Sequence, residues 1–169
     1  PVDIESIGTR TPPEKPWAAR GHEGRRKKNI INSLYIEPEE LERLVMERYE
    51  RYAKIAAEET RWEEYRMDDA EICVVAYGIT ARVCKTAVDA ARKKGIRSGM
   101  FRPITLWHYP SAQLDAACAR AGTRRVLVAE LNMGQMIDDV RLAINCRLPV
   151  VFHGRTGGML PSPDEILAK

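Results

Sequence analysis

The 169-residue sequence is poor in the residues that build metal and redox centres. It has four cysteines and three histidines, and no two cysteines form a C-x-x-C pair. Iron-sulfur and zinc sites draw several thiolates or imidazoles from closely spaced positions. Cys73, Cys84, Cys118 and Cys146 instead fall one at a time in helical or extended patterns. We therefore predict that they are small core side chains and that the chain holds no metal.

The sequence also lacks a charge excess and long apolar runs. Its 27 basic and 24 acidic residues are interspersed and leave a net charge of +3, which does not favour nucleic acid or an anionic membrane as a partner. No apolar run approaches the roughly 20 residues that cross a bilayer, and the opening PVDIESIGTRTPPEKP contains no apolar targeting core. We expect a soluble, cytoplasmic protein. Because the chain begins with Pro1, it is expected to be a processed product or a piece of a longer polypeptide.

Composition divides the chain into three parts. Residues 1–28 are rich in proline, glycine and charge without a sustained hydrophobic period, which predicts an arm or linker. Residues 29–68 are predicted to form a helical connecting segment, and residues 69–169 an α/β domain. A basic cluster on the arm is either a solvated linker or a contact for a phosphate-bearing ligand or acidic partner. The cluster consists of Arg25, Arg26, Lys27 and Lys28.

The connecting segment contains an amphipathic helical pattern from Pro38 to about Glu59. Apolar residues recur there at intervals of three and four, as on one face of a helix. Exposed ion pairs along such a helix contribute only a few tenths of a kcal/mol each. We therefore expect the helix to be held by packing of its apolar stripe, on the following domain or on a partner subunit. The stripe comprises Leu41, Leu44, Val45, Tyr49, Tyr52, Ile55 and Ala56.

After residue 68, strands and helices alternate. Apolar runs without period-two alternation predict strands that are buried on both faces. The strands are expected at 72–77, 96–101, 125–129 and 149–152. Helical patterns cover about 80–94, 111–122 and 133–145, and a last helix starts at 163. This order requires right-handed crossovers, so we predict a three-layer α/β/α fold with a mostly parallel sheet.

Side chains that can cap helices stand at the expected helix starts. Thr80, Ser111 and Asn132 each precede a helical pattern. The sequence SPDE at 162–165 matches a capping box, with Ser162 at the N-cap and Glu165 at N3. The third helix is expected to bury a face that comprises Ile137, Val140, Leu142 and Ile144.

Loops after the strands of a parallel sheet gather at its carboxyl edge, where ligands and partners bind. These loops are YGITAR at 77–82, RPITLWHYP at 102–110, ELNMGQ at 130–135 and HGRTGGMLP at 153–161. YGITAR lacks the G-x-G-x-x-G of a dinucleotide fingerprint, and GRTGG lacks the Lys-Ser/Thr of a P-loop. No Ser-His-Asp, Cys-His or paired-carboxylate pattern is present. We therefore expect no catalytic residue within this segment.

Nine loop residues are candidates for an interface or for the border of a cleft. The rings of RPITLWHYP suit either a subunit interface or the core of this domain, and both alternatives stay open. Glu130 and Gln135 either reach into an interface with a catalytic domain or belong to a structural turn. The glycines of GRTGG permit close approach to a neighbouring chain. The candidates are Arg102, Trp107, His108, Tyr109, Glu130, Asn132, Gln135, Arg155 and Thr156.

Five blocks of this sequence carry a family resemblance. They are NIINSLYIEPEELE, VVAYGITAR, FRPITLWHYP, VAELNMGQMIDDVRLAI and FHGRTGGMLPSPDEI. In this order, from about Asn29 to Leu167, they resemble the α-type subunit of 2-oxoacid:ferredoxin oxidoreductases. The similarity is strongest to the branched-chain 2-oxoacid (2-oxoisovalerate) type, with the 2-oxoglutarate type next. The sequence departs at His108, where the family's LWP[FY]P-like stretch has a second proline.

The resemblance implies that the chain is the carboxy-terminal part of that subunit, with a transketolase C-terminal-like domain. Such a complex decarboxylates a 2-oxoacid with thiamine diphosphate, reduces ferredoxin through iron-sulfur clusters and releases an acyl-CoA. The resemblance places thiamine diphosphate, magnesium and the clusters in other domains or subunits, so this chain is expected to bind no cofactor itself. Its expected partners are the other subunits in a homo- or hetero-oligomer, with ferredoxin and coenzyme A reached through the complex.

An alternative hypothesis from another class is a stand-alone binding module. In that case the GRTGG loop and the basic arm would bind coenzyme A or another phosphorylated ligand. The two hypotheses differ in what the isolated chain does. The first expects assembly without turnover, and the second expects saturable ligand binding by the chain alone.

Overall fold

The computed structural model describes residues 11–19, 21, 27 and 30–169. The chain divides into two units, Pro1–Val45 and Met46–Lys169. Helix α1 (Pro38–Glu59) begins in the first unit, and its boundaries agree with the predicted helix. Of the basic cluster on the arm, Arg25, Arg26 and Lys28 lie outside the described residues, so both of its interpretations stay predictions.

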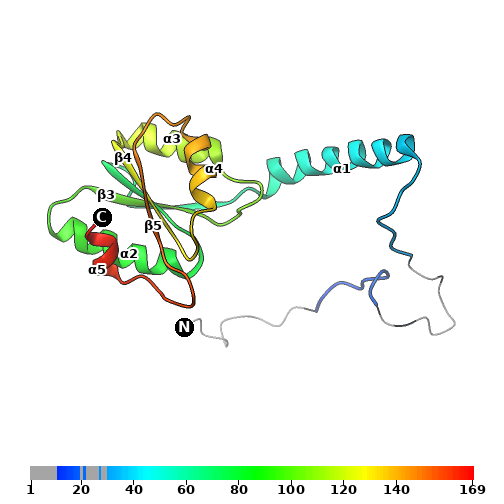
Figure 1. The fold of residues 1–169 in the computed structure, drawn as a ribbon, viewed down its shortest axis with the longest axis horizontal. Coiled ribbons are helices and arrows are strands. Elements are labelled where there is room, and N and C mark those ends of the chain that lie inside the picture. The colour runs from blue at the N-terminus through cyan, green and yellow to red at the C-terminus, as the bar shows by residue number, and fades with distance from the viewer. Residues whose placement is uncertain (1–10, 20, 22–26, 28–29) are drawn as a thin grey trace. The chain divides into compact units, whose positions relative to one another are not determined.

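The second unit contains the predicted alternation of strands and helices (Figure 1). None of the helices in the described ranges combines the length and the apolar character that a bilayer crossing requires. The elements after α1 are β1 (Trp62–Tyr65), β2 (Ile72–Val75), α2 (Gly78–Lys93), β3 (Ser98–Pro103), α3 (Ser111–Ala121), β4 (Arg125–Glu130), α4 (Met136–Ala143), β5 (Val150–Gly154) and α5 (Pro163–Leu167).

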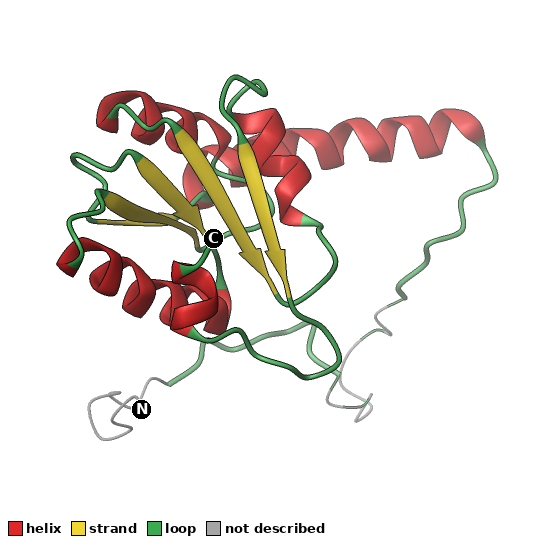
Figure 2. Ribbon diagram, turned by 60° about the vertical axis from the view of Figure 1, so that its left-hand side comes forward, coloured by secondary structure: helices red, strands yellow, loops and turns green. Residues whose placement is uncertain are grey.

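The strands form one five-stranded sheet in the order β1-β3-β2-β4-β5, seen in Figure 2. β2 pairs in parallel with β3 and with β4, and β4 pairs in parallel with β5. The chain moves outward from β2 to β3 and then crosses back to β4 on the other side of β2. The topological switch point of the sheet therefore lies between β2 and β4.

Two apolar clusters cover opposite faces of the sheet, because successive strand side chains point to opposite sides. Val75 and Phe101 pack in a cluster with residues of α3 and α4. Val74, Met100 and Leu127 pack in a second cluster with residues of α2 and α5. Figure 1 shows the two helix pairs on the two sides of the sheet. The predicted three-layer α/β/α architecture is confirmed.

The sequence analysis did not predict β1, which lies within the segment assigned to a helical connection. β1 runs antiparallel to β3 at the edge of the sheet, with Glu63 opposite Arg102. Glu63 also binds Lys85 of α2 at 2.8 Å and Arg102 at 3.0 Å. A hydrogen bond from Lys85 lowers the pKa of the Glu63 carboxyl, and the hydrogen bond from Arg102 lowers it to a smaller extent. The short, charged WEEY sequence lacks a strong strand pattern, and long-range pairing with β3 defines it.

Three of the four predicted helix caps are wrong. Thr80 lies inside α2 and is 3% exposed, because the helix already begins at Gly78. Ser111 is the first residue of α3, and no side chain caps that helix. Asn132 lies in a turn before α4, whose N-cap position is occupied by Gln135. Before α4, the Glu130 carboxylate at the end of β4 accepts from the first N–H groups of the helix, a contact that a local cap pattern does not contain.

Two apolar expectations near the end of α4 are also wrong. Leu142 is 73% exposed, whereas Ile137, Val140 and Ile144 are buried. The buried residues follow a three-four spacing, and a residue two positions from Val140 lies on the opposite side of a helix. Cys146 is exposed in the turn after α4, while the other three cysteines are buried as predicted.

The capping box of α5 is confirmed and provides a stability test. The Ser162 side chain accepts a hydrogen bond from the Glu165 N–H at 3.2 Å, and the Glu165 carboxylate accepts one from the Ser162 N–H at 3.0 Å. Ser162→Ala should lower the free energy of unfolding by about 1 kcal/mol, measured by urea denaturation. Ser111→Ala is the matched control, because the Ser111 side chain makes no cap bond. Equal losses in the two variants would contradict the assignment.

Candidate functional site

The four loops singled out from the sequence share one edge of the sheet, here called the carboxyl edge. β2, β3, β4 and β5 run parallel, with Val75 opposite Phe101 and Val128 and with Glu130 opposite Gly154. Strands in such a register end side by side. The predicted gathering of these loops is therefore confirmed, and the switch point between β2 and β4 lies within it.

Glu130 ends β4 and is the buried carboxylate of the carboxyl edge, with 1% of its surface exposed. It accepts hydrogen bonds from the backbone N–H groups of Met136 at 2.9 Å and Ile137 at 3.1 Å. The Gln135 N–H and the Asn132 side-chain amide bind it as well, at 3.3 and 3.0 Å. The first turn of a helix carries unpaired N–H groups and a partial positive charge. In α4, Glu130 accepts hydrogen bonds from these N–H groups and compensates the partial positive charge. Its side chain is therefore used within this domain and does not face a partner.

The turn between β4 and α4 is also held by Asn132. Its side-chain oxygen accepts a hydrogen bond from the Gly134 N–H at 2.7 Å, which closes an Asx turn. For Glu130 and Gln135 the sequence left an interface and a structural turn as alternatives, and only Gln135 has an exposed side chain. Met133, which sequence reasoning did not select, is 82% exposed beside it. These two side chains are the groups that the turn presents outward.

The aromatic side chains of the loop from 104 to 110 differ in burial. Tyr109 packs in the core between the sheet and α3, so the core alternative is correct for this ring. Burial raises the pKa of its hydroxyl. Trp107 and His108 are exposed, which leaves them as interface candidates. Arg102 is half-buried and pairs with Glu63, so its guanidinium joins β3 to β1.

An aromatic patch joins this loop to the carboxyl-terminal half of α1. It consists of Tyr49, Tyr52, Trp107 and His108. The Tyr52 ring lies 5.8 Å from Tyr49 and 4.8 Å from Trp107, and the Trp107 ring lies 6.3 Å from His108. Tyr49 is 66% exposed and Trp107 is 57% exposed. Contact among these rings therefore leaves much of their surface in water.

The aromatic patch includes Tyr49 and Tyr52, two residues of the apolar stripe predicted for α1. No residue of α1 is buried, and in the part of α1 that belongs to the second unit Tyr49, Tyr52 and Ile55 of the stripe are exposed. Sequence reasoning treated Tyr49 and Tyr52 as packing residues and missed them as site residues. The available signal was two aromatic side chains at helical spacing within an otherwise aliphatic stripe.

The loop after β5 is tied back to α5 and to the β4 end. The Arg155 guanidinium forms an ion pair with Glu165, and the backbone N–H of Arg155 donates a hydrogen bond to the Glu130 carbonyl at 3.1 Å. Arg155 is the main cause of a lowered pKa of the Glu165 carboxyl, followed by the Ser162 N–H. A Cβ placed on Gly154 would lie 2.4 Å from the Asn132 carbonyl oxygen. The first glycine of GRTGG therefore serves close packing within this chain, and Thr156 remains exposed.

His153 makes stability depend on pH. Burial, followed by the charge of Lys169, lowers the pKa of its imidazole from the ordinary 6.5. Below about pH 6.5 the unfolded chain takes up the proton first, so stability should fall with pH down to the folded-state pKa. His153→Gln should flatten this slope in urea unfolding curves measured across that window. An unchanged slope would show that the imidazole contributes nothing there.

Glu130 and the amino end of α4 are not available to a metal-bound diphosphate at the carboxyl edge. Such a group requires oxygen ligands for the metal and donors for the phosphates. Both oxygens of Glu130 are engaged by the amino end of α4, which in turn leaves those N–H groups occupied. Across the described ranges, no group of three or more His, Cys, Asp or Glu residues is arranged to hold a metal ion.

The fold and its edge define a class, an α/β domain whose described residues form a scaffold with an exposed aromatic patch. A family model, the pyruvate:ferredoxin oxidoreductase core domain II, matches residues 70–166. The chain belongs to this family. The resemblance recognised in the five sequence blocks is thereby confirmed.

Curated relatives include subunits of two oxidoreductases. The ketoisovalerate oxidoreductase subunit VorB of Methanothermobacter thermautotrophicus is 41% identical over 161 residues, which cover 93% of this chain and 44% of the relative. The 2-oxoglutarate synthase subunit KorA of Methanothermobacter marburgensis is 37% identical over 102 residues, which cover 60% of this chain and 27% of the relative. The chain thus spans less than half the length of these relatives.

Solved structures share the fold. A 2-oxoglutarate:ferredoxin oxidoreductase from Magnetococcus marinus matches with a TM-score of 0.66 and 21% identity, over 79% of this chain and 23% of that one. A split-gene transketolase matches with a TM-score of 0.53 and 17% identity, over 64% of this chain and 39% of that one. The transketolase-like fold predicted from the sequence is confirmed.

Proposed function

We propose that this chain is part of the α-type subunit of a cytoplasmic, thiamine-diphosphate-dependent 2-oxoacid:ferredoxin oxidoreductase. The complex would oxidatively decarboxylate a 2-oxoacid to an acyl-CoA and reduce ferredoxin. The match of the family model to residues 70–166 supports the class of enzyme. The 41% identity to a ketoisovalerate oxidoreductase subunit supports a branched-chain 2-oxoacid as the substrate.

Within that complex, the chain would contribute assembly and a border of the active-site cleft. The observation that carries this role is the aromatic patch, because exposed tryptophan and tyrosine side chains are enriched at the centres of protein interfaces. Gln135 and Thr156 would extend the contact along the carboxyl edge. Thiamine diphosphate, magnesium and iron-sulfur clusters would be held by other domains or subunits, in agreement with the occupied carboxylate of Glu130.

The contribution of the patch can be tested in the full-length parent subunit by co-purification with the other subunits. Trp107→Ala should weaken assembly by roughly 30-fold, the effect of a central interface residue. Its thermal unfolding temperature should change little, because the ring is largely in water. Leu142→Ala is the matched control, since Leu142 is also an exposed apolar side chain but lies on α4.

The two parts of the proposal fail in different ways. Unaltered assembly of the Trp107→Ala subunit would remove the role of the aromatic patch. A full-length parent that co-purifies with no thiamine-enzyme subunit and no iron-sulfur protein would contradict the proposed complex itself.

The hypothesis of a stand-alone module for coenzyme A has less support. Arg155, the cation of the GRTGG loop, is paired with Glu165. Gly154 is explained by its close approach to Asn132 within this chain. Calorimetric titration of the chain with coenzyme A distinguishes the hypotheses, and saturable binding would favour the module.

A further inference from the structure

We propose that the chain has a second site, which binds the phosphate group of a small molecule in a hollow between α2 and the turn from β1 to β2. The residues that line this cationic hollow are Arg66, Asp89, Arg92 and Lys93. Its volume is about 370 Å³. This size falls within the range of small-molecule sites, which is about 300–1,000 Å³. α2 begins at the carboxyl edge with Gly78 and ends with Lys93, so the hollow lies at the other end of the parallel strands. The inference is therefore independent of the proposed function.

Two segments that are separated in the sequence supply the lining. Arg92 and Lys93 follow Asp89 by three and four residues, which places all three on one face of α2. Arg66 follows β1 and has a left-handed backbone, with φ of 53°. A Cβ on Gly99 would lie 2.5 Å from the Arg66 carbonyl oxygen, so this glycine of β3 allows the turn to approach the sheet. The hollow is thus a product of tertiary packing and not of one run of basic residues.

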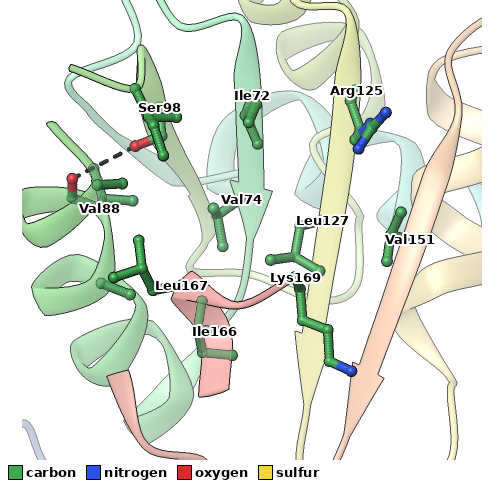
Figure 3. A pocket seen from close by; sticks show the side chains of 13 residues that line it. Ile72, Val74, Val88, Ser98, Arg125, Leu127, Val151, Ile166, Leu167 and Lys169 are labelled. Atoms are coloured by element: carbon green, nitrogen blue, oxygen red, sulfur yellow. Dashed lines mark hydrogen bonds between the residues drawn. The ribbon is translucent and has the colours of Figure 1, made fainter. Parts of the chain in front are cut away.

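The Arg92 guanidinium is held in place by the protein itself. Its Nε donates to the Ser98 carbonyl at 2.6 Å, and its Nη2 donates to the Arg66 carbonyl at 2.8 Å. Ser98 is buried, and its hydroxyl is directed to the Val88 carbonyl at 3.5 Å (Figure 3). Of the five N–H donors of a guanidinium, the two on Nη1 of Arg92 have no partner among the described residues. An anion that binds them meets a preorganised donor, which lowers the entropy cost of binding.

The charges around the hollow leave an excess of one cation. Asp89 pairs with Arg66 at 2.8 Å, and Asp69, which borders the hollow without lining it, pairs with Arg92 at 2.6 Å. Each carboxylate therefore has its own guanidinium. Lys93 is exposed and forms no ion pair within the part of the chain that the structure describes. Its ammonium group is the charge that an incoming anion would neutralise.

The lining selects a phosphate group over other anions. All of the lining side chains are charged, so the hollow offers no apolar side chain to the organic part of a ligand. A phosphate group carries about two negative charges at pH 7 and has several acceptor oxygens. It can therefore bind the Nη1 group of Arg92, the ammonium of Lys93 and the guanidinium of Arg66 together. A carboxylate has a single charge and competes poorly with the two carboxylates already present.

Titration of the full 169-residue chain with inorganic phosphate at constant ionic strength tests the site by NMR. Saturable shifts in the millimolar range are expected for the Nε–H signal of Arg92 and for the amide signals of Arg66 and Lys93. Ribose 5-phosphate should bind as inorganic phosphate does, because the site contacts only the phosphate group. Acetate should bind roughly 10-fold more weakly, since it forgoes one charge-assisted hydrogen bond. Absence of saturable shifts, equal binding of acetate, or binding of the ester alone would overturn the proposal.

Two adjacent lysines separate a specific contact from general attraction. Lys93→Gln should weaken phosphate binding about 10-fold, the effect of one lost charge-assisted contact. Lys94→Gln removes the same charge one residue further along, and it should bind as the parent does because Lys94 is absent from the lining. Equal weakening in both variants would show attraction by net charge and would contradict the site. Both side chains are exposed, so the substitutions leave the core intact.

Discussion

Glu130→Ala should lower the free energy of unfolding by about 3 kcal/mol, because several buried N–H groups lose their acceptor at once. The carboxylate binds the backbone of Met136 and Ile137 and the side chain of Asn132. Without it, the first turn of α4 is left with buried donors and an uncompensated helix dipole. Urea denaturation monitored by circular dichroism measures the loss.

The matched control for Glu130 is another acid in the first turn of α4. Asp138 is exposed and, among the described residues, pairs with Arg141 alone, so Asp138→Ala should cost about 0.5 kcal/mol. Glu130→Gln keeps the shape but removes the charge, and it should fall between the two. Similar stabilities of Glu130→Ala and Asp138→Ala would show that burial of the carboxylate has no structural importance.

Gly154→Ala should cost about 2–3 kcal/mol, through a steric conflict between two backbone segments. The added Cβ would lie 2.4 Å from the Asn132 carbonyl oxygen and 2.8 Å from the Phe152 ring. Relief requires β5 to move away from the turn that Glu130 and Asn132 hold. The loss is measured by thermal and urea unfolding, and the shift of the turn by amide NMR signals of residues 131–135.

Gly157→Asn is the control for Gly154. Gly157 has φ of 62°, and a Cβ there would meet no atom within 4 Å. Asparagine tolerates this left-handed conformation, so the change should cost less than about 1 kcal/mol. Equal destabilisation at the two positions would show that chain flexibility, and not close packing, explains the glycines of this loop.

Glu130 and Gly154 show how the carboxyl edge is built. Glu130 ties α4 to β4, and Gly154 lets β5 approach the same turn. The Arg155 N–H adds a bond to the Glu130 carbonyl. The edge is thus held by contacts within this domain, while the aromatic patch remains exposed beside it. This division agrees with a scaffold that presents a preformed surface to partners.

The fold was largely predictable because its signals are local. Unbroken apolar runs marked β2, β4 and β5, and the three-four spacing marked the helices between the strands. The capping box at Ser162 lies within four residues of sequence and was found where predicted. Strand-helix alternation then left a parallel, doubly covered sheet as the simplest arrangement. The sequence did not predict β1, because its pairing with β3 joins residues that are far apart in the chain.

The candidate site was predictable only as a set of loops. The sequence placed Trp107 and Tyr109 in one stretch, yet one ring is exposed and the other is in the core. It left Glu130 open between an interface and a structural turn, and the structure uses its carboxylate to hold the first turn of α4. Each of these outcomes depends on partners that only folding brings within reach.

The sequence by itself determined the order of elements, the parallel α/β class and the membership of an oxidoreductase family. Those properties follow from hydrophobic period, short capping motifs and blocks of residue identity, all of which are read along the chain. Tertiary structure decided which helix ends are capped, which charges are paired and which aromatic rings are buried. The physical reason is that hydrogen bonds, ion pairs and cavities form between residues that are distant in sequence and adjacent only in the packed molecule.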